Sequence, residues 1–209
     1  MGDEGMTPAE RIAVGRTKGF MPEAEGAALR DAGLRAGRIG PLLEVGSYCG
    51  LSAIHLGSAA RAAGTVLITV DHHRGSEETQ PGWAHHDPEV VDLRTGRTDT
   101  LPFLRRTLED AGLEDVVIPV VGDSPTVARL VRGDLGLVFI DGGHALDIAM
   151  ADYEAWAGHL APGGLLVIHD VFEDPADGGQ APFEVWQRAV ADGFIPESTT
   201  GSLRVLRRG

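Results

Sequence analysis

The stretch Leu42-Leu-Glu-Val-Gly-Ser-Tyr-Cys-Gly50 decides the fold of this chain. Its first four residues form a short, mostly apolar run of the kind that makes a buried strand, and its two glycines allow the backbone to turn sharply. A helical pattern follows over residues 51–63, and a second apolar run over residues 65–70 ends at Asp71. Strand, glycine turn, helix and strand in this order predict the start of a parallel α/β sheet.

The same alternation continues along the chain and predicts a single α/β domain over residues 1–209. Two helices, one that starts after Thr7 and one over residues 23–36, are expected to form an N-terminal cover within residues 1–38. Further strands are expected at 116–121, 135–140 and 164–169, helices at 100–111, 145–160 and 181–191, and a hairpin at 194–206. A proline in the run 116–121 favours an edge position for that strand.

The chain has 209 residues, a formal net charge of −13 and one cysteine. A surface this acidic argues against nucleic acid or an anionic membrane as a partner, because both favour clustered Lys and Arg. The first residues lack the basic and apolar regions of a signal peptide, and no apolar run approaches the ~20 residues that span a bilayer. A lone cysteine suits a reducing compartment. We therefore expect a cytoplasmic protein.

Residues 72–99 show no clear period and are rich in polar side chains, including His72 and His73, with Trp83 among them. Loops this long inside a compact domain are uncommon and often functional. We expect this segment to be a substrate lid. The alternative is a surface insertion without a role in the reaction.

The glycine turn and the acid at the end of the second strand predict a nucleotide site. The helix after the turn exposes unpaired N–H groups, and Asp71 can accept hydrogen bonds from both ribose hydroxyls. A dinucleotide site requires the pattern G-x-G-x-x-G against the diphosphate, but Tyr48 stands where the middle glycine would be. A nucleotide ligand without a diphosphate tolerates that residue, so a dehydrogenase is disfavoured.

Two further acids, Asp141 and Asp170, stand at the ends of the predicted strands 135–140 and 164–169. Ligands of open α/β sheets bind at this edge. Two close carboxylates are costly unless a cation lies between them, and oxygen ligands suit Mg²⁺ or Mn²⁺. His144 is placed to act as general base on a hydroxyl that the metal activates. In the alternative, the acids only cap helices and His144 activates the acceptor alone.

The spacing E-x-G-x-x-x-G from Glu44 to Gly50 resembles the first motif of class I methyltransferases that use S-adenosylmethionine (SAM). Val121-Gly-Asp-Ser124 resembles the acidic motif that faces adenine in that family, and Ala161-Pro-Gly-Gly-Leu165 resembles the turn before its fifth strand. The resemblance implies a Rossmann-like, doubly wound sheet in strand order 3-2-1-4-5-7-6 with strand 7 antiparallel. It also implies SAM as cofactor, held by Glu44, Gly46, Gly50, Ser52, Asp71, His72, Asp123, Ser124 and Asp141.

Asp141 and His144 resemble the metal-dependent O-methyltransferases of the sugar type, which have histidine where the catechol type has lysine. Asp170 matches the first acid of the second pair in that family, but Val171 stands where a further Asp or Asn is expected. The resemblance implies Asp141 and Asp170 as ligands of the metal, and it leaves the third protein ligand open. Glu173 is our candidate, with Glu89 in reserve.

The stretches DHHRGSEE from Asp71 and HDVFEDPADGGQAPF from His169 resemble a small actinobacterial group of 1-O-methyltransferases of methylmannose polysaccharide synthesis. This resemblance implies a sugar hydroxyl as acceptor, such as the 1-OH of a short, partly methylated mannoside. Trp83, His73 and His144 are then the candidates for contact with the sugar.

Two other functions fit part of the pattern. One is a metal-independent O-methyltransferase of small molecules, and the other is a catalytically silent SAM-binding subunit. The acidic pair and the histidine favour the metal-assisted enzyme, because a binding protein needs neither. Small acidic enzymes of this type are often homodimers, so a homodimer is a further expectation.

Replacing His144 by Ala should lower the turnover of methyl transfer, because the acceptor hydroxyl loses its base. Removing a general base typically costs ~10²–10⁴-fold in rate. The affinity for SAM, measured by calorimetric titration, should stay nearly unchanged. An equal loss of SAM binding and turnover would contradict the assignment.

Overall fold

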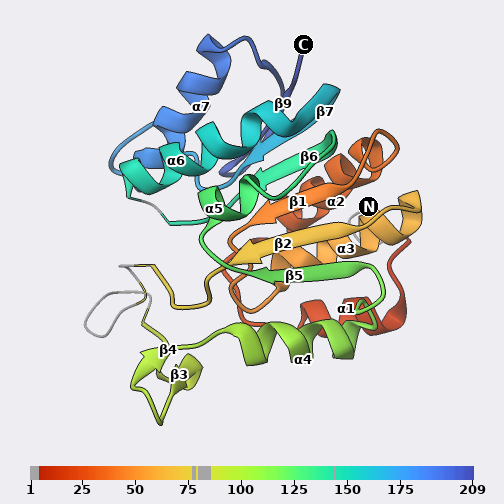
Figure 1. The fold of residues 1–209 in the computed structure, drawn as a ribbon, viewed down its shortest axis with the longest axis vertical. Coiled ribbons are helices and arrows are strands. Elements are labelled where there is room, and N and C mark those ends of the chain that lie inside the picture. The colour runs from red at the N-terminus through yellow and green to blue at the C-terminus, as the bar shows by residue number, and fades with distance from the viewer. Residues whose placement is uncertain (1–4, 77–78, 80–85, 144) are drawn as a thin grey trace.

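A seven-stranded sheet forms the middle layer of the protein in the computed structural model, which describes residues 5–76, 79, 86–143 and 145–209. Its strands are β1 (Leu42–Val45), β2 (Leu67–Asp71), β5 (Val117–Val121), β6 (Leu135–Ile140), β7 (Leu160–Ile168), β8 (Ile195–Thr200) and β9 (Leu203–Arg207). Their order in space is β5-β2-β1-β6-β7-β9-β8, and β9 runs antiparallel to both neighbours (Figure 1). Numbered along the chain, this order is 3-2-1-4-5-7-6, so the predicted fold is confirmed.

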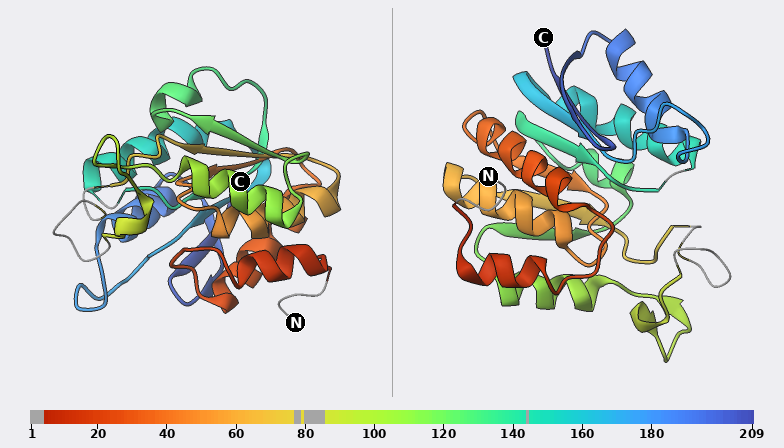
Figure 2. Two further views of the ribbon diagram at one scale, coloured as in Figure 1. Left: turned by 90° about the horizontal axis from the view of Figure 1, so that it is seen from below. Right: turned by 180° about the vertical axis from the view of Figure 1, so that it is seen from behind.

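Helices lie on both faces of the sheet, and each face has its own core of buried apolar side chains. They are α1 (Pro8–Val14), α2 (Glu23–Ala36), α3 (Leu51–Ala63), α4 (Leu101–Ala111), α5 (Ser124–Ala128), α6 (Leu146–Trp156) and α7 (Ala181–Ala191). The first four helices cover one face and the last three cover the other (Figures 1 and 2). Both faces of β1 and β6 are therefore buried, as their apolar runs predict. Across the described part of the chain, no helix has the length and apolar character of a membrane span.

The N-terminal helices begin near the predicted residues. Thr7 caps α1 by accepting the N–H of Glu10, while the Glu10 side chain accepts the N–H of Thr7. α1 packs on α4, and α2 packs on α3 and reaches β9. The first turn of α2 therefore lies close to the hairpin that closes the sheet.

One predicted helix and its following strand have different bounds in the structure. The helix expected over residues 145–160 ends at Trp156, where a short 3₁₀ turn, η3 (Ala157–His159), leads into β7. β7 starts at Leu160, earlier than expected, because Leu160 already pairs with Leu135 of β6. The Pro-Gly-Gly stretch therefore lies within β7, as an irregularity between the pairs Leu135–Leu160 and Leu137–Leu165 at which Gly163 has a φ of +77°.

The segment 72–99 contains regular structure that its sequence did not indicate. Its described residues form the 3₁₀ helix η2 (Pro88–Val90) and a small hairpin of β3 (Val91–Asp92) and β4 (Arg97–Thr98). This hairpin lies next to the N-terminal start of α4 and apart from the main sheet (Figure 1). The role of the segment as a substrate lid stays a prediction, and Trp83 lies outside the described residues.

Replacing Gly136 by Ala should lower the free energy of unfolding by ~2 kcal/mol or more, as overpacking of a tight contact does. A Cβ atom at this position in β6 would lie 2.1 Å from the carbonyl oxygen of Ala36 and 2.7 Å from that of Gly40. Both are backbone atoms, and they cannot move aside without shifting the end of α2 and the turn that follows it. Urea denaturation measures the change.

Gly158 provides the matched control, because a Cβ atom there would meet nothing within 4 Å. Gly158→Ala should change the free energy of unfolding by no more than ~0.5 kcal/mol. Equal effects of the two replacements would contradict the close packing of α2 on β6.

Candidate active site

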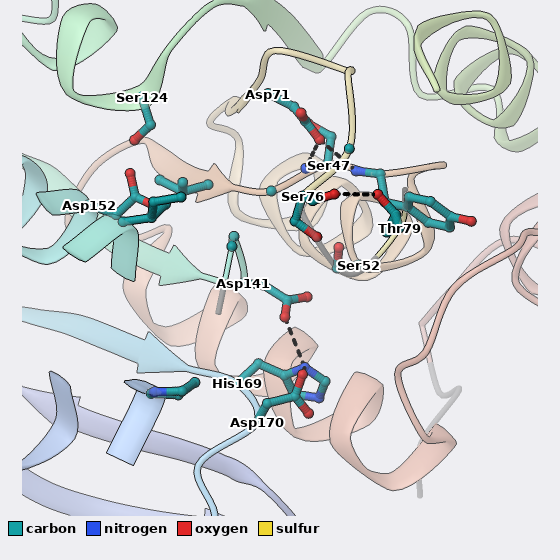
Figure 3. Close-up of a pocket in the computed structure, with 18 of the residues that line it drawn as sticks. Ser47, Ser52, Asp71, Ser76, Thr79, Ser124, Asp141, Asp152, His169 and Asp170 are labelled. Carbon is teal, nitrogen blue, oxygen red and sulfur yellow. Dashed lines mark hydrogen bonds and ion pairs between the residues drawn. The ribbon is translucent and has the colours of Figure 1, made fainter. Parts of the chain in front are cut away.

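A cavity of about 1020 Å³ opens at the carboxyl ends of β1, β2, β6 and β7. This edge is the place where open α/β sheets bind ligands, next to the point at which the strand order reverses. Figure 3 shows the polar side chains that enter the cavity from these strand ends and from the adjoining loops. The labelled side chains include Ser47, Ser52, Asp71, Ser124, Asp141, Asp152, His169 and Asp170.

Gly46 sets the shape of the turn after β1. Its φ is +95°, and a Cβ atom on it would lie 2.2 Å from the carbonyl oxygen of Asp141. The preceding carbonyl, of Val45, accepts the N–H of Asp141 at 2.9 Å. Glycine fits this left-handed position because it has no side chain to meet the backbone of Asp141, and its predicted role in admitting the cofactor stays a prediction.

Gly50 has a different environment from Gly46. It caps the start of α3 with a φ of +97°, and a Cβ atom there would lie 2.8 Å from the Leu104 side chain of α4. Gly50 is not among the residues that line the cavity. Its lack of a side chain allows α4 to pack against the turn rather than a ligand to approach.

Asp71 holds the turn in place from the end of β2. Its Oδ2 accepts the backbone N–H groups of Ser47 and Tyr48, both at 3.0 Å, and its Oδ1 accepts that of His73 at 2.7 Å. A carboxylate has about four acceptor positions. With three in use, Asp71 retains room for one hydroxyl group of a ribose rather than the two expected from the sequence.

Glu44 lies behind the turn instead of in the cavity. It is fully buried, and this burial raises the pKa of its carboxyl group to about 7, although hydroxyls of Ser52 and Thr69 donate to it and oppose the shift. Ser52 itself lines the cavity from the first turn of α3. Glu44 therefore supports the turn after β1 from beneath. Of the two residues, Ser52 is the one that faces the cavity.

Asp123 and Ser124 enter the cavity where β5 leads into α5. Asp123 also caps this helix, because its Oδ2 accepts the N–H and the hydroxyl of Thr126 at 3.1 and 2.7 Å. Ser124 accepts the indole N–H of Trp156 at 2.8 Å and hydrogen-bonds with Asp152, which burial keeps at a raised pKa of about 6. Both predicted residues thus lie at the cavity, next to Asp152 of α6, for which the sequence indicated no role.

His72 and His73 lie on opposite sides of the chain after Asp71. The half-exposed His72 lines the cavity, 4.0 Å from the Asp71 carboxylate. His73 is buried, its Nδ1 lies 2.7 Å from the hydroxyl of Thr100, and burial lowers its pKa. His73 is absent from the cavity wall, so its predicted contact with the acceptor receives no support from the geometry.

Asp141, His169 and Asp170 come together at the ends of β6 and β7. The Nδ1 atom of His169 lies 3.0 Å from an oxygen of Asp141 and 3.4 Å from one of Asp170, and the side chains face one another in Figure 3. Asp170 has a φ of +54°, a rare conformation for a residue with a side chain. Such strain is found mostly where a site requires one orientation.

The cluster suits a divalent cation. Possible ligand atoms of Asp141, His169 and Asp170 all lie within 4.8 Å of one another. Burial alone lowers the pKa of His169, but hydrogen bonds to Asp141 and Asp170 and their charges outweigh it and raise the pKa to about 11. The two carboxylates therefore favour the positively charged form of His169, and a cation bound between them would displace the proton on Nδ1.

The remaining predicted residues lie apart from this cluster or beyond the described chain. Glu173 is mostly exposed, 3.7 Å from Arg204, and Glu89 is exposed and paired with Lys18 at 2.5 Å. Neither joins a candidate metal cluster among the described residues. His144 lies outside the described residues, so its role as base stays a prediction.

Two features of the site were missed in the sequence. Residues 18–21, between α1 and α2, line the cavity, and Lys18 forms an ion pair with Asp87 at 2.5 Å. His169 was taken only as the last residue of a strand. Its place directly before Asp170 was the available signal, because neighbouring residues at a strand end can both reach the same site.

A family of proteins described as "Methyltransferase domain" matches residues 43–171, which is more than half of the chain. The match runs from β1 through the end of β7 and includes the turn at Gly46 and the cluster at Asp141 and Asp170. All the strand ends that surround the cavity therefore lie within the matched part. All three residues of the candidate cation site lie there too.

Several solved structures share the fold. The SAH-bound methyltransferase PaMTH1 of Podospora anserina has a TM-score of 0.66 and 14% identity, covering 99% of this chain and 90% of its own. An O-methyltransferase of Bacillus cereus in complex with SAH has a TM-score of 0.64 and 16% identity, covering 97% and 91%. TomG of Streptomyces achromogenes, an O-methyltransferase in complex with SAM, has a TM-score of 0.62 and 19% identity, covering 97% and 91%.

Replacing Glu44 by Gln should change how stability depends on pH. With a pKa of about 7 in the folded state and 4.5 in the unfolded state, Glu44 keeps a proton on folding that the unfolded chain releases between these values. The free energy of unfolding that Glu44 contributes therefore falls as pH rises from 4.5 and levels off above 7, by ~3 kcal/mol in all.

Urea denaturation across this pH range measures the difference between Glu44→Gln and the unaltered protein. The variant should gain stability relative to the unaltered protein as pH rises, whereas Glu109→Gln, an exposed change on α4, should not. A difference that stays constant with pH would contradict the raised pKa of Glu44.

Proposed function

The chain belongs to the methyltransferase-domain family, and from this premise we propose that it transfers a methyl group from SAM to a hydroxyl group of a small molecule. The proposal includes a divalent cation bound at Asp141, His169 and Asp170. The observation that carries it is the convergence of these three side chains on one cavity with the glycine turn of β1.

The cofactor is assigned to the part of the cavity between β1, β2 and β5. In this proposal Gly46 and Ser52 admit it, Asp71 accepts one ribose hydroxyl, and Asp123 and Ser124 lie beside the adenine. Of the structural neighbours described above, two were solved with SAH and one with SAM. The position of each side chain on the cavity wall supports the assignment.

The reaction needs alignment more than covalent chemistry. The acceptor oxygen attacks the methyl carbon, an O–C bond forms as the S–C bond breaks, and SAH leaves with the bonding electron pair on sulfur. The proton of the hydroxyl passes to a base, and we assign that role to His144 from the sequence. Holding the acceptor in line with the methyl group supplies much of the rate.

A cation between Asp141 and Asp170 would lower the pKa of an acceptor hydroxyl and fix its position. Two carboxylates suit Mg²⁺ or Mn²⁺, and the imidazole of His169 is also acceptable to transition metals. His169 is therefore proposed as a ligand beside the two acids. Glu173, the third metal ligand expected from the sequence, is mostly exposed and would have to turn toward the cavity to reach the cation.

The finer proposal is a sugar as the acceptor, with the 1-OH of a short, partly methylated mannoside as the first compound to test. It rests on the resemblance of two stretches to an actinobacterial group. Phe172 and Pro182 line the same cavity and add apolar surface to it, against which the apolar face of a sugar ring can pack. A homodimer in solution is proposed separately, because small acidic enzymes of this type are often homodimers.

A second candidate function is metal-independent O-methylation. The imidazolium of His169, with its raised pKa of about 11, already supplies a positive charge between the two acids. In this case the cluster would order the loops without binding a metal ion. A silent SAM-binding subunit is the third possibility to be separated by experiment.

The test is methyl transfer from labelled SAM to a methylated mannoside and to a catechol, after EDTA treatment and again with Mg²⁺ or Mn²⁺ restored. The proposal predicts activity that EDTA abolishes and the cation restores. Asp141→Asn and Asp170→Asn should each lower the rate by ~100-fold or more, since even residues behind a ligand cost ~10–100-fold. Asp110→Asn, an exposed change on α4, should retain it.

Each contrary outcome identifies one of the alternatives. Full activity in EDTA would favour the metal-independent enzyme. SAM binding without transfer to any hydroxyl acceptor would favour the silent subunit. Transfer to the catechol but not to the mannoside would leave the O-methyltransferase in place and overturn the sugar acceptor.

A further inference from the structure

Glu25 is a buried carboxylate that the proposed chemistry does not use. It lies in the first turn of α2, and only 4% of its surface is exposed. Glu23, in the same turn, is exposed and is sufficient to complement the helix dipole there. A buried carboxylate is costly unless hydrogen bonds compensate for it, so the partners of Glu25 explain its position.

Both oxygens of Glu25 have partners in the neighbourhood of the cavity. Oε2 lies 2.6 Å from Nε2 of His169, which is 144 positions away in the sequence. Oε1 accepts the backbone N–H of Ser202 at 2.6 Å and its hydroxyl at 3.2 Å. A Cβ atom on Gly201 would lie 2.1 Å from Oε1, so the hairpin between β8 and β9 makes room for this carboxylate.

The contact with Glu25 fixes which way His169 faces. A carboxylate can only accept, so the Nε2 atom carries a proton and donates it to Glu25. The other ring nitrogen, Nδ1, then lies 3.0 Å from Asp141 and 3.4 Å from Asp170. Since the His169 side chain is only 3% exposed, water cannot readily replace Glu25 as its partner.

We propose that Glu25 is a positioning residue, which holds His169 in the Nε2–H tautomer so that Nδ1 can bind the cation between Asp141 and Asp170. The inference rests on the proposed function and extends it to the N-terminal helix. Histidine ligands commonly donate their second N–H to a carboxylate, which fixes the ring and raises its basicity. Here that carboxylate comes from an element outside the matched methyltransferase region.

Glu25→Gln separates this role from simple packing. Glutamine has nearly the same shape, but it offers one accepting oxygen where glutamate offers two. It can therefore serve either His169 or Ser202, and its NH₂ group faces a donor at the other. The orientation of His169 should loosen while the fold persists.

The experiment is a titration of metal-free protein with Mn²⁺ in the presence of SAH. Electron paramagnetic resonance measures the concentration of free Mn²⁺ at each step, from which the dissociation constant follows. Glu25→Gln should weaken Mn²⁺ binding by ~10–100-fold, the usual effect of losing such a partner. Glu23→Gln, on the exposed side of the same turn, should bind Mn²⁺ like the unaltered protein.

The outcomes separate this inference from the proposed function. If the unaltered protein binds Mn²⁺ and Glu25→Gln binds it equally well, the role of Glu25 is overturned and the cation site stands. If the unaltered protein binds no Mn²⁺, the cation site itself fails, and the role of Glu25 fails with it.

A second measurement needs no change at Glu25 and covers the case in which the variant does not fold. Nitrogen-15 NMR of imidazole-labelled protein saturated with Mg²⁺ reports the protonation of His169, whose signals are assigned by their loss in His169→Gln. We expect a proton on Nε2 and none on Nδ1. A proton on Nδ1 at saturating Mg²⁺ would overturn the proposal.

Discussion

The close approach of the backbone at Gly46 to the backbone of Asp141 is the constraint on which the rest of the site depends. It exists because β1 and β6 are adjacent parallel strands that end at the same level, with Val45 opposite Ile140. A side chain at Gly46 would clash with the carbonyl oxygen of Asp141. This single contact therefore joins the loop proposed for the cofactor to the first residue of the proposed cation site.

The second constraint is the charge that gathers beside this contact. Three carboxylates, those of Glu25, Asp141 and Asp170, lie within 3.4 Å of the two ring nitrogens of His169. Like charges held this close repel one another. A divalent cation offsets that repulsion in the proposed enzyme, so binding of the metal and ordering of the site depend on each other.

The sequence predicted those parts of the molecule that follow from local pattern. The apolar runs predicted the strands, and the family resemblance predicted their order in the sheet. The rule that ligands bind at the carboxyl ends of strands predicted that Asp141 and Asp170 lie close together. The contact of Glu25 with His169 could not be predicted, because it depends on how α2 packs beside the β8–β9 hairpin. The packing role of Gly50 was missed for the same reason, since Leu104 reaches it from α4.

Anomalous diffraction from crystals grown with SAH and Mn²⁺ tests the central claim most directly. The account predicts one manganese peak at about 2 Å from a carboxylate oxygen of Asp141, from Nδ1 of His169 and from a carboxylate oxygen of Asp170. The peak should lie in the same cavity as the SAH. Crystals in which SAH is ordered and no manganese lies at these three side chains would contradict the account.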